Sequence, residues 1–391
     1  MIESLRLKMF KPFQDQTLDL KALTLLSGLN SCGKSSVLQS LLLLRQSYQQ
    51  GLLPKKGLAL NGELVNLGTA KDAFFQGITR RNLGFDLTWT TDGAPDVLEA
   101  SWGFSVSRED DPLELDVLNL ESSPVVPEVY QSSLFGNKFH YLQAERIGPR
   151  PFNEMSDYQV RRLGQLGTGG EYAAHFLSIY RRERKIADAK LSHPRLKVIE
   201  DSSEAEQQSM DLIDQVEAWM GEISPGTRLG LDSHPDMGLV GLRYAYGDSD
   251  RYRATNVGFG ITYTLPIVVA VLASEPGTLI MIENPEAHLH PKGQAKMGEL
   301  LALAASCGIQ VVVETHSDHV LNGIRLAVHG GKLEAEDVQL HYFQREERNR
   351  ELVTEVISPR IDRNGRIDQW PDGFFDEWDN SLQALLEPRS V

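Results

Sequence analysis

The sequence predicts an α/β fold in which a glycine-rich loop joins a buried strand to a helix. Three observations support this prediction. Residues 1–50 follow the order strand, turn, strand, glycine loop and helix. Two continuous apolar runs, 278–282 and 309–313, are typical of strands covered on both faces. Short alternating segments between residues 60 and 140 indicate an antiparallel layer.

The N-terminal elements follow from periodicity. Residues 2–9 alternate between apolar and polar, as in a half-buried strand, and a turn is expected at Pro12. The leucines of residues 18–25 continue the strand-like pattern. From Lys34 to Arg45 the apolar residues change to helical spacing.

Further along the chain, the pattern changes twice. Residues 171–182 and the amphipathic segment 204–221 are expected to be helices. Strand–helix alternation of a parallel sheet returns from 238 to 345. We expect four parts: an N-terminal lobe with the glycine loop and the antiparallel layer (1–150), a helical insertion (151–235), a C-terminal lobe (236–332) and a small α/β segment (333–391).

Composition limits the possible classes of protein. The chain has 391 residues with 41% hydrophobic and 24% charged residues, which are ordinary globular values. The longest apolar run, 265–273, is about half of the ~20 residues that a membrane span needs. Cys32 and Cys307 provide neither a disulfide framework nor a metal motif. We therefore expect a cytoplasmic protein without a membrane segment.

The net charge of −15 argues against a surface that binds nucleic acid over its whole extent. A local nucleic-acid-binding site is still an alternative, because residues 181–185 (R-R-E-R-K) are followed by Lys190, Arg195 and Lys197. The alternative, which this composition favours, is a solvated helix face.

The strongest motif is G-L-N-S-C-G-K-S-S at residues 28–36, which matches G-x-x-x-x-G-K-[ST] between a predicted strand and a predicted helix. Backbone N–H groups of such a loop bind phosphate at a helix N-terminus. Lys34 is expected to reach the β- and γ-phosphates, and the Ser35 hydroxyl to coordinate Mg²⁺. The expected ATP-binding residues here are Gly28, Asn30, Ser31, Gly33, Lys34, Ser35 and Ser36.

Two later strands end in polar residues. The segment T-L-I-M-I-E-N-P-E-A-H-L-H-P (278–291) places Glu283 at a strand end, where it can hold Mg²⁺ through water. The segment I-Q-V-V-V-E-T-H-S (309–317) places His316 similarly, where an imidazole can contact the γ-phosphate or the attacking water.

A second anion site is expected where N-V-G-F-G-I-T (256–262) opens a helix. Its candidate residues are Asn256, Gly258, Gly260 and Thr262. The alternative is an ordinary helix cap.

These motifs, in this order, resemble the ABC-type ATPases of the SMC/RecF/OLD group. The terminal W-P-D-G-F-F-D-E and the segment E-R-I-G-P-R (145–150) are similar to a bacterial family of such ATPases with a small C-terminal domain of unknown function. The resemblance implies an ABC-type ATPase head that binds ATP and Mg²⁺ between two protomers, with segment 256–262 facing the partner's nucleotide. It also implies a homodimer or higher oligomer, an effector protein encoded nearby, and a role in DNA maintenance or anti-phage defence.

The sequence departs from the ABC pattern after Glu283. Asn284 stands where these ATPases usually carry the catalytic glutamate, and an amide cannot act as a base. Either Glu286 takes this role or hydrolysis is slow. Two functions therefore remain: an ATPase that acts on DNA, or an ATP-gated sensor that switches a separate effector without acting on DNA itself.

Overall fold

The computed structural model describes residues 1–75, 82–90, 97–106, 116–124, 126–196, 209–247, 249–348 and 351–386. The chain forms two compact units. Unit 1 comprises Met1–Gly136, Val338–Asp362 and Arg366–Val391, and unit 2 comprises Asn137–Asp337 and Arg363–Gly365. Lys197 and the first five residues of the helix expected at 204–221 lie outside the described residues.

An antiparallel sheet of six strands forms much of unit 1, in the order β2-β1-β5-β6-β7-β4. The strands are β1 (Ile2–Phe10), β2 (Phe13–Asp19), β4 (Gly57–Ala59), β5 (Asn82–Trp89), β6 (Leu98–Ser105) and β7 (Val117–Ser122). Alternate side chains of these strands are buried, as around Phe85 and Trp102. The predicted antiparallel layer is confirmed, and it includes the first two strands of the chain.

The glycine loop follows a different strand of unit 1, β3 (Leu23–Gly28), which pairs in parallel with β15 (Val338–Arg348). β15 pairs in antiparallel with β16 (Glu351–Ile357). The helices of this unit are α1 (Lys34–Gln49), α2 (Ala70–Ala73) and α8 (Glu377–Leu386). The expectation of one strand-like run over 18–25 was wrong, because β2 ends at Asp19 and β3 begins in another sheet.

Unit 2 contains three parallel strands, β8 (Phe139–Leu142), β13 (Leu279–Glu283) and β14 (Gln310–Glu314), with β13 paired to both others. The helices α5 (Phe259–Ala273), α6 (Pro291–Ser306) and α7 (Asp318–His329) connect or precede them. Every residue from Leu279 to Ile282 and from Val311 to Val313 is completely buried, which confirms the two apolar runs as doubly covered strands. Among the described residues, no helix is both long and apolar enough to span a membrane.

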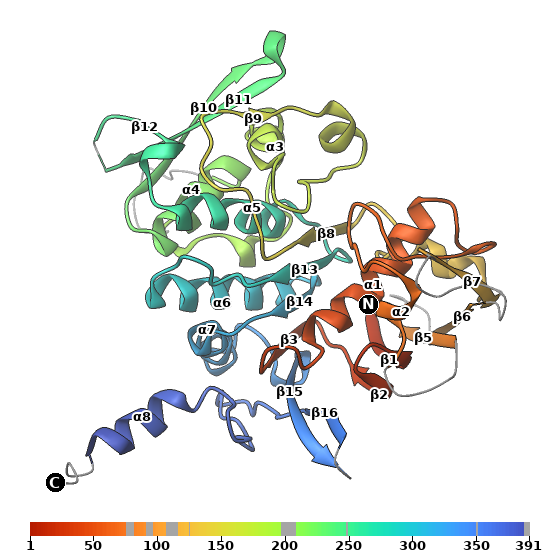
Figure 1. The fold of residues 1–391 in the computed structure, drawn as a ribbon. Coiled ribbons are helices and arrows are strands. Elements are labelled where there is room, and N and C mark those ends of the chain that lie inside the picture. Colours follow the sequence, from red (N-terminus) through yellow and green to blue (C-terminus); the bar gives the residue numbers. More distant parts are fainter. Residues whose placement is uncertain are drawn as a thin grey trace. The chain divides into compact units, whose positions relative to one another are not determined.

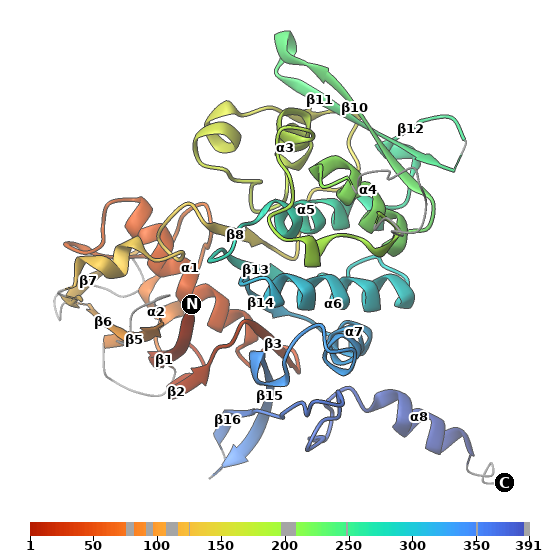
Figure 2. The ribbon, with the colours of Figure 1, turned by 180° about the vertical axis from the view of Figure 1, so that it is seen from behind.

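The remainder of unit 2 holds α3 (Ala173–Tyr180) and α4 (Leu212–Ile223), close to two predicted helices. It also holds β9 (Asn153–Glu154), β10 (Thr227–His234), β11 (Leu239–Tyr246) and β12 (Tyr252–Arg253), in one small antiparallel sheet. In Figure 1 and Figure 2 the β10–β11 hairpin extends away from α3 and α4. The expectation of parallel-sheet alternation from residue 238 was therefore wrong at its start, where a hairpin returns through Gly238 at φ 65°.

Candidate functional site

The glycine loop of unit 1 has a backbone that only glycine allows at two positions. Gly28 has φ 134°, and a Cβ atom there would lie 2.1 Å from the carbonyl oxygen of Phe343. Gly33 has φ 104° and caps α1, and a Cβ atom would lie 2.6 Å from the Phe13 ring. The motif's two glycines are thus required by both conformation and close packing.

The groups that would receive phosphate are backbone amides and one lysine. Within the described chain, no hydrogen bond is formed by the backbone N–H groups of residues 30–33. Lys34 is buried, and its Nζ donates to the carbonyl oxygens of Gly28 (2.9 Å) and Leu29 (2.8 Å). The first turn of α1 contains no acidic residue to offset the positive end of its dipole. These groups fit a phosphate chain, and Ser35 follows Lys34 in the position that would bind Mg²⁺.

Sequence reasoning missed a second cation at this loop. Arg345 on β15 donates from its guanidinium to the carbonyl oxygen of Ser31 at 2.9 Å. No local pattern could have found it, because the two residues are 314 positions apart and meet through the parallel pairing of β3 and β15.

The predicted acid of unit 2, Glu283, ends β13 and is held by β8 and by the segment that follows it. Its carboxylate accepts hydrogen bonds from the Tyr141 hydroxyl (2.8 Å) and the Ala144 N–H (3.2 Å). Burial and the Glu283 charge raise the pKa of Tyr141 well above its usual range, so this hydroxyl stays a donor. A fixed, half-buried carboxylate of this kind fits a role in the shell of a Mg²⁺ ion.

Glu286 lies against the end of the neighbouring strand. Its carboxylate accepts from Thr315 Oγ1 (2.7 Å) and from the backbone N–H of His316 (2.8 Å), while the His316 residue is exposed. The three predicted catalytic residues Glu283, Glu286 and His316 thus belong to one unit and lie at or just after the ends of two paired strands, β13 and β14. Glu286 does not cap a helix, because α6 begins at Pro291 and is capped by His290.

The predicted second anion segment opens α5 as expected, with Gly258 as the N-cap. Asn256 and Gly258 are exposed. A Cβ atom at Gly260 would lie 2.5 Å from the carbonyl oxygen of His288, so α5 packs directly on the loop after β13. Thr262 is buried inside the unit, with 5% of its surface exposed, and its hydroxyl does not reach the surface.

The basic stretch is only partly available to a ligand. Arg184 pairs with Glu275 at 3.5 Å and lies over the Phe176 ring, and Arg195 pairs with Glu222 at 3.2 Å. The exposed members are Arg181, Arg182, Lys185, Lys190 and, despite its ion pair, Arg195.

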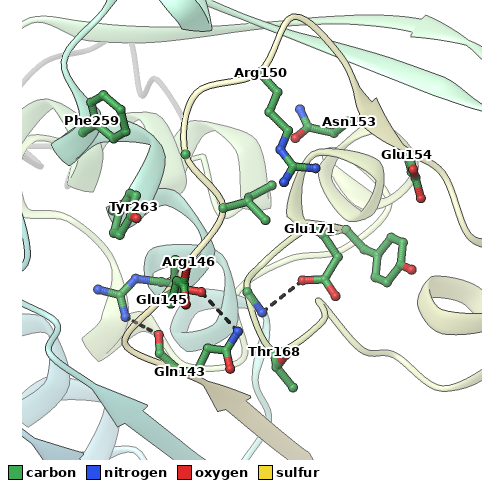
Figure 3. A pocket seen from close by; sticks show the side chains of 14 residues that line it. Gln143, Glu145, Arg146, Arg150, Asn153, Glu154, Thr168, Glu171, Phe259 and Tyr263 are labelled. Carbon is green, nitrogen blue, oxygen red and sulfur yellow. Dashed lines mark hydrogen bonds between the residues drawn. The ribbon is translucent and has the colours of Figure 1, made fainter. Parts of the chain in front are cut away.

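A cavity of about 640 Å³ lies in unit 2 between the start of α5 and the loops at 143–150 and 168–172 (Figure 3). Arg146 and Tyr263 are close together on one side of it, and Arg150 and Asn153 on another. No group of three or more His, Cys, Asp or Glu side chains in the described residues could hold a metal ion by itself.

Three family models match the chain. Residues 1–82 match "AAA ATPase domain", residues 171–322 match "AAA domain, putative AbiEii toxin, Type IV TA system", and residues 333–385 match "Protein of unknown function (DUF3696)". No curated protein matches the sequence.

Solved structures of SMC heads are similar at low identity. An SMC head bound to the C-winged helix domain of ScpA has 13% identity and a TM-score of 0.49, covering 92% of this chain and 98% of that chain. The SMC head from Thermotoga maritima has 11% identity and a TM-score of 0.45, covering 91% and 98%. A head with an extended coiled coil from Pyrococcus furiosus, bound to the C-terminal domain of ScpA, has 13% identity and a TM-score of 0.49, covering 99% of both chains.

The family matches agree with the resemblance found in the sequence: the chain joins AAA-type ATPase domain sequence to a C-terminal domain of unknown function.

Proposed function

We propose that this protein binds and hydrolyses ATP with Mg²⁺ as an ABC-type ATPase head. The observation that carries the proposal is the glycine loop: two positive-φ glycines, amides without acceptors in the described chain, and buried Lys34. Lys34 and the loop amides would bind the β- and γ-phosphates, and Ser35 and Glu283 are each a candidate Mg²⁺ ligand. The bound ion would neutralise charge that develops on the transferring phosphoryl group.

Glu286 is our candidate for the general base, and His316 for the residue that contacts the γ-phosphate or the attacking water. Support for Glu286 comes from its fixed carboxylate, which is held by Thr315 and the His316 backbone. Asn284 could orient a water molecule but could not take its proton.

We further propose that ATP is bound between two protomers arranged head to tail. The support is the exposed start of α5, a 15-residue helix whose positive end begins at its N-cap Gly258, with exposed Asn256 two residues before it. The test is the mass of a Glu286→Gln variant by light scattering, with and without saturating MgATP. A doubled mass with ATP is expected, and a monomer under both conditions would contradict the sandwich arrangement.

The biological setting that the family resemblance favours is DNA maintenance or anti-phage defence, with a separate effector protein. The second candidate is a slowly hydrolysing, ATP-gated sensor that does not act on DNA. It is favoured by Asn284, by the net charge of −15, and by the pairing of Arg184 and Arg195 with carboxylates. Turnover measured with and without duplex DNA separates the two, since only the first predicts stimulation.

A further inference from the structure

Arg146 makes an unusual set of contacts for a buried cation. Only 2% of its surface is exposed. Its guanidinium donates to three backbone carbonyl oxygens, those of Gln143 (2.9 Å), Glu283 (2.7 Å) and Asn284 (2.6 Å). Burial lowers the pKa of Arg146 to about 10, so the side chain still carries its charge at neutral pH. A charged donor bound to two successive carbonyls fixes their orientation.

Two of the carbonyl oxygens that Arg146 binds lie at the end of β13, the strand whose last residue is Glu283. Glu283 is the last residue of β13, and Asn284 follows it with φ 45°. Residues just before Arg146 in the chain also hold the Glu283 carboxylate, through the Tyr141 hydroxyl and the Ala144 N–H. Both the side chain and the backbone of the predicted Mg²⁺ residue are therefore positioned by residues 141–146, a short segment that begins within β8.

The other side of Arg146 faces α5. Its guanidinium lies 5.5 Å from the centre of the Tyr263 ring, a cation–π contact. The rings of Tyr263 and Phe259 lie 4.9 Å and 5.6 Å from the His288 ring. Together with the close approach of Gly260 to the His288 carbonyl, these contacts pack the first two turns of α5 against the loop that carries Glu286.

We infer that Arg146 is a positioning residue that ties the start of α5 to the backbone of Glu283 and Asn284. This inference rests on the proposed function, in which segment 256–262 of each protomer meets the nucleotide of its partner. Through Arg146, the start of α5, which the proposed function places at the partner's nucleotide, is joined to the backbone of the predicted Mg²⁺ residue.

The cavity in Figure 3 makes a sharp test possible, because Arg146 forms part of its wall. Replacing Arg146 with alanine leaves an empty space in place of the guanidinium group. Free guanidinium ions can reach this space through the cavity. The measurements are turnover, ATP affinity, thermal unfolding, and hydrogen exchange of the peptide 279–290 without nucleotide. Each is made with and without guanidinium chloride, and with methylammonium chloride as the control ion, which carries the same charge but lacks the planar fork of donors.

We expect Arg146→Ala to lower turnover by about 10–100-fold, the usual effect of losing an outer-shell partner, with ATP affinity nearly unchanged. Exchange of 279–290 should rise, and guanidinium but not methylammonium should reverse both changes. Arg146→Lys keeps the charge and should remain impaired, since an ammonium group lacks the planar fork. Arg325→Ala is the matched control, because Arg325 also donates to a backbone carbonyl, that of Gly365, at 2.7 Å in the same unit.

Exchange of 279–290 equal to that of the original protein would overturn the inference. So would an equal loss of turnover in Arg325→Ala, or a loss that guanidinium and methylammonium restore alike. If the unaltered protein neither binds nor hydrolyses ATP, the proposed function fails, whereas the exchange measurement, made without nucleotide, still decides the positioning role.

Discussion

Replacing Glu286 with glutamine tests whether its carboxylate takes the proton of the attacking water. In the structure this carboxylate accepts from Thr315 Oγ1 and from the His316 N–H. A glutamine oxygen can keep the bond to His316, but its NH₂ group must then face Thr315 Oγ1, which already accepts from the Ser317 N–H at 3.0 Å. The Thr315 hydroxyl loses its acceptor while completely buried, so we expect a stability loss of about 1–2 kcal/mol.

The catalytic effect should be much larger than the effect on folding. Loss of a general base lowers turnover by ~10²–10⁴-fold, and ATP affinity should stay nearly intact because Glu286 makes no predicted contact with phosphate. The assay is steady-state hydrolysis at saturating MgATP, normalised to ATP-bound protein, alongside thermal unfolding. Glu299→Gln is the matched control, since Glu299 also accepts a side-chain hydrogen bond in unit 2, from Lys296 at 2.9 Å. Full turnover in a stably folded Glu286→Gln protein would refute the assignment.

Four further predictions concern ATP binding, turnover, nucleic-acid binding and the dependence of stability on pH. Lys34→Ala should abolish tight ATP binding, because it removes the buried cation of the glycine loop; an unchanged dissociation constant in equilibrium binding would contradict the assignment. Asn284→Glu should raise turnover by placing a base at the usual position, at a cost of about 1–2 kcal/mol in unfolding free energy from the left-handed backbone. If the basic stretch binds nucleic acid, replacing four of its cations together should weaken binding and make the affinity depend less on salt. The four are Arg181, Arg182, Arg184 and Lys185. An unchanged dependence of affinity on salt would mean that the stretch is a solvated helix face. Stability should fall as pH drops below about 6.5, because burial lowers the pKa of His341 in the folded state and the unfolded chain then binds the extra proton. Thermal unfolding of a His341→Gln variant should show a weaker pH dependence over this range.

The sequence could predict those parts of the site whose functional residues lie close together in the chain. The glycine loop is local: Gly28, Gly33 and Lys34 act within one turn between a strand and a helix. The ends of β13 and β14 could be predicted because doubly covered strands appear as continuous apolar runs.

The contacts that sequence could not predict join distant residues. Arg146 reaches the Glu283 carbonyl across 137 positions, and Arg345 reaches Ser31 across 314. In each case an arginine binds a backbone carbonyl, which leaves no complementary charge to recognise in the sequence. The β10–β11 hairpin was missed for another reason, since the alternation of buried and exposed side chains along its two strands is irregular.

The departure at Asn284 and the position of Glu286 can be understood as one feature of the fold. Asn284 has φ 45°, a conformation that asparagine tolerates better than glutamate, and its N–H donates to the Glu314 carbonyl at 2.8 Å. This left-handed residue turns the chain immediately after β13, so that Glu286 returns to the end of β14 and bonds to Thr315. Arg146 holds the carbonyls on both sides of the turn. A glutamate at 284 would be strained in this turn by about 1–2 kcal/mol, so asparagine is the better residue at the position that directs Glu286 to the end of β14.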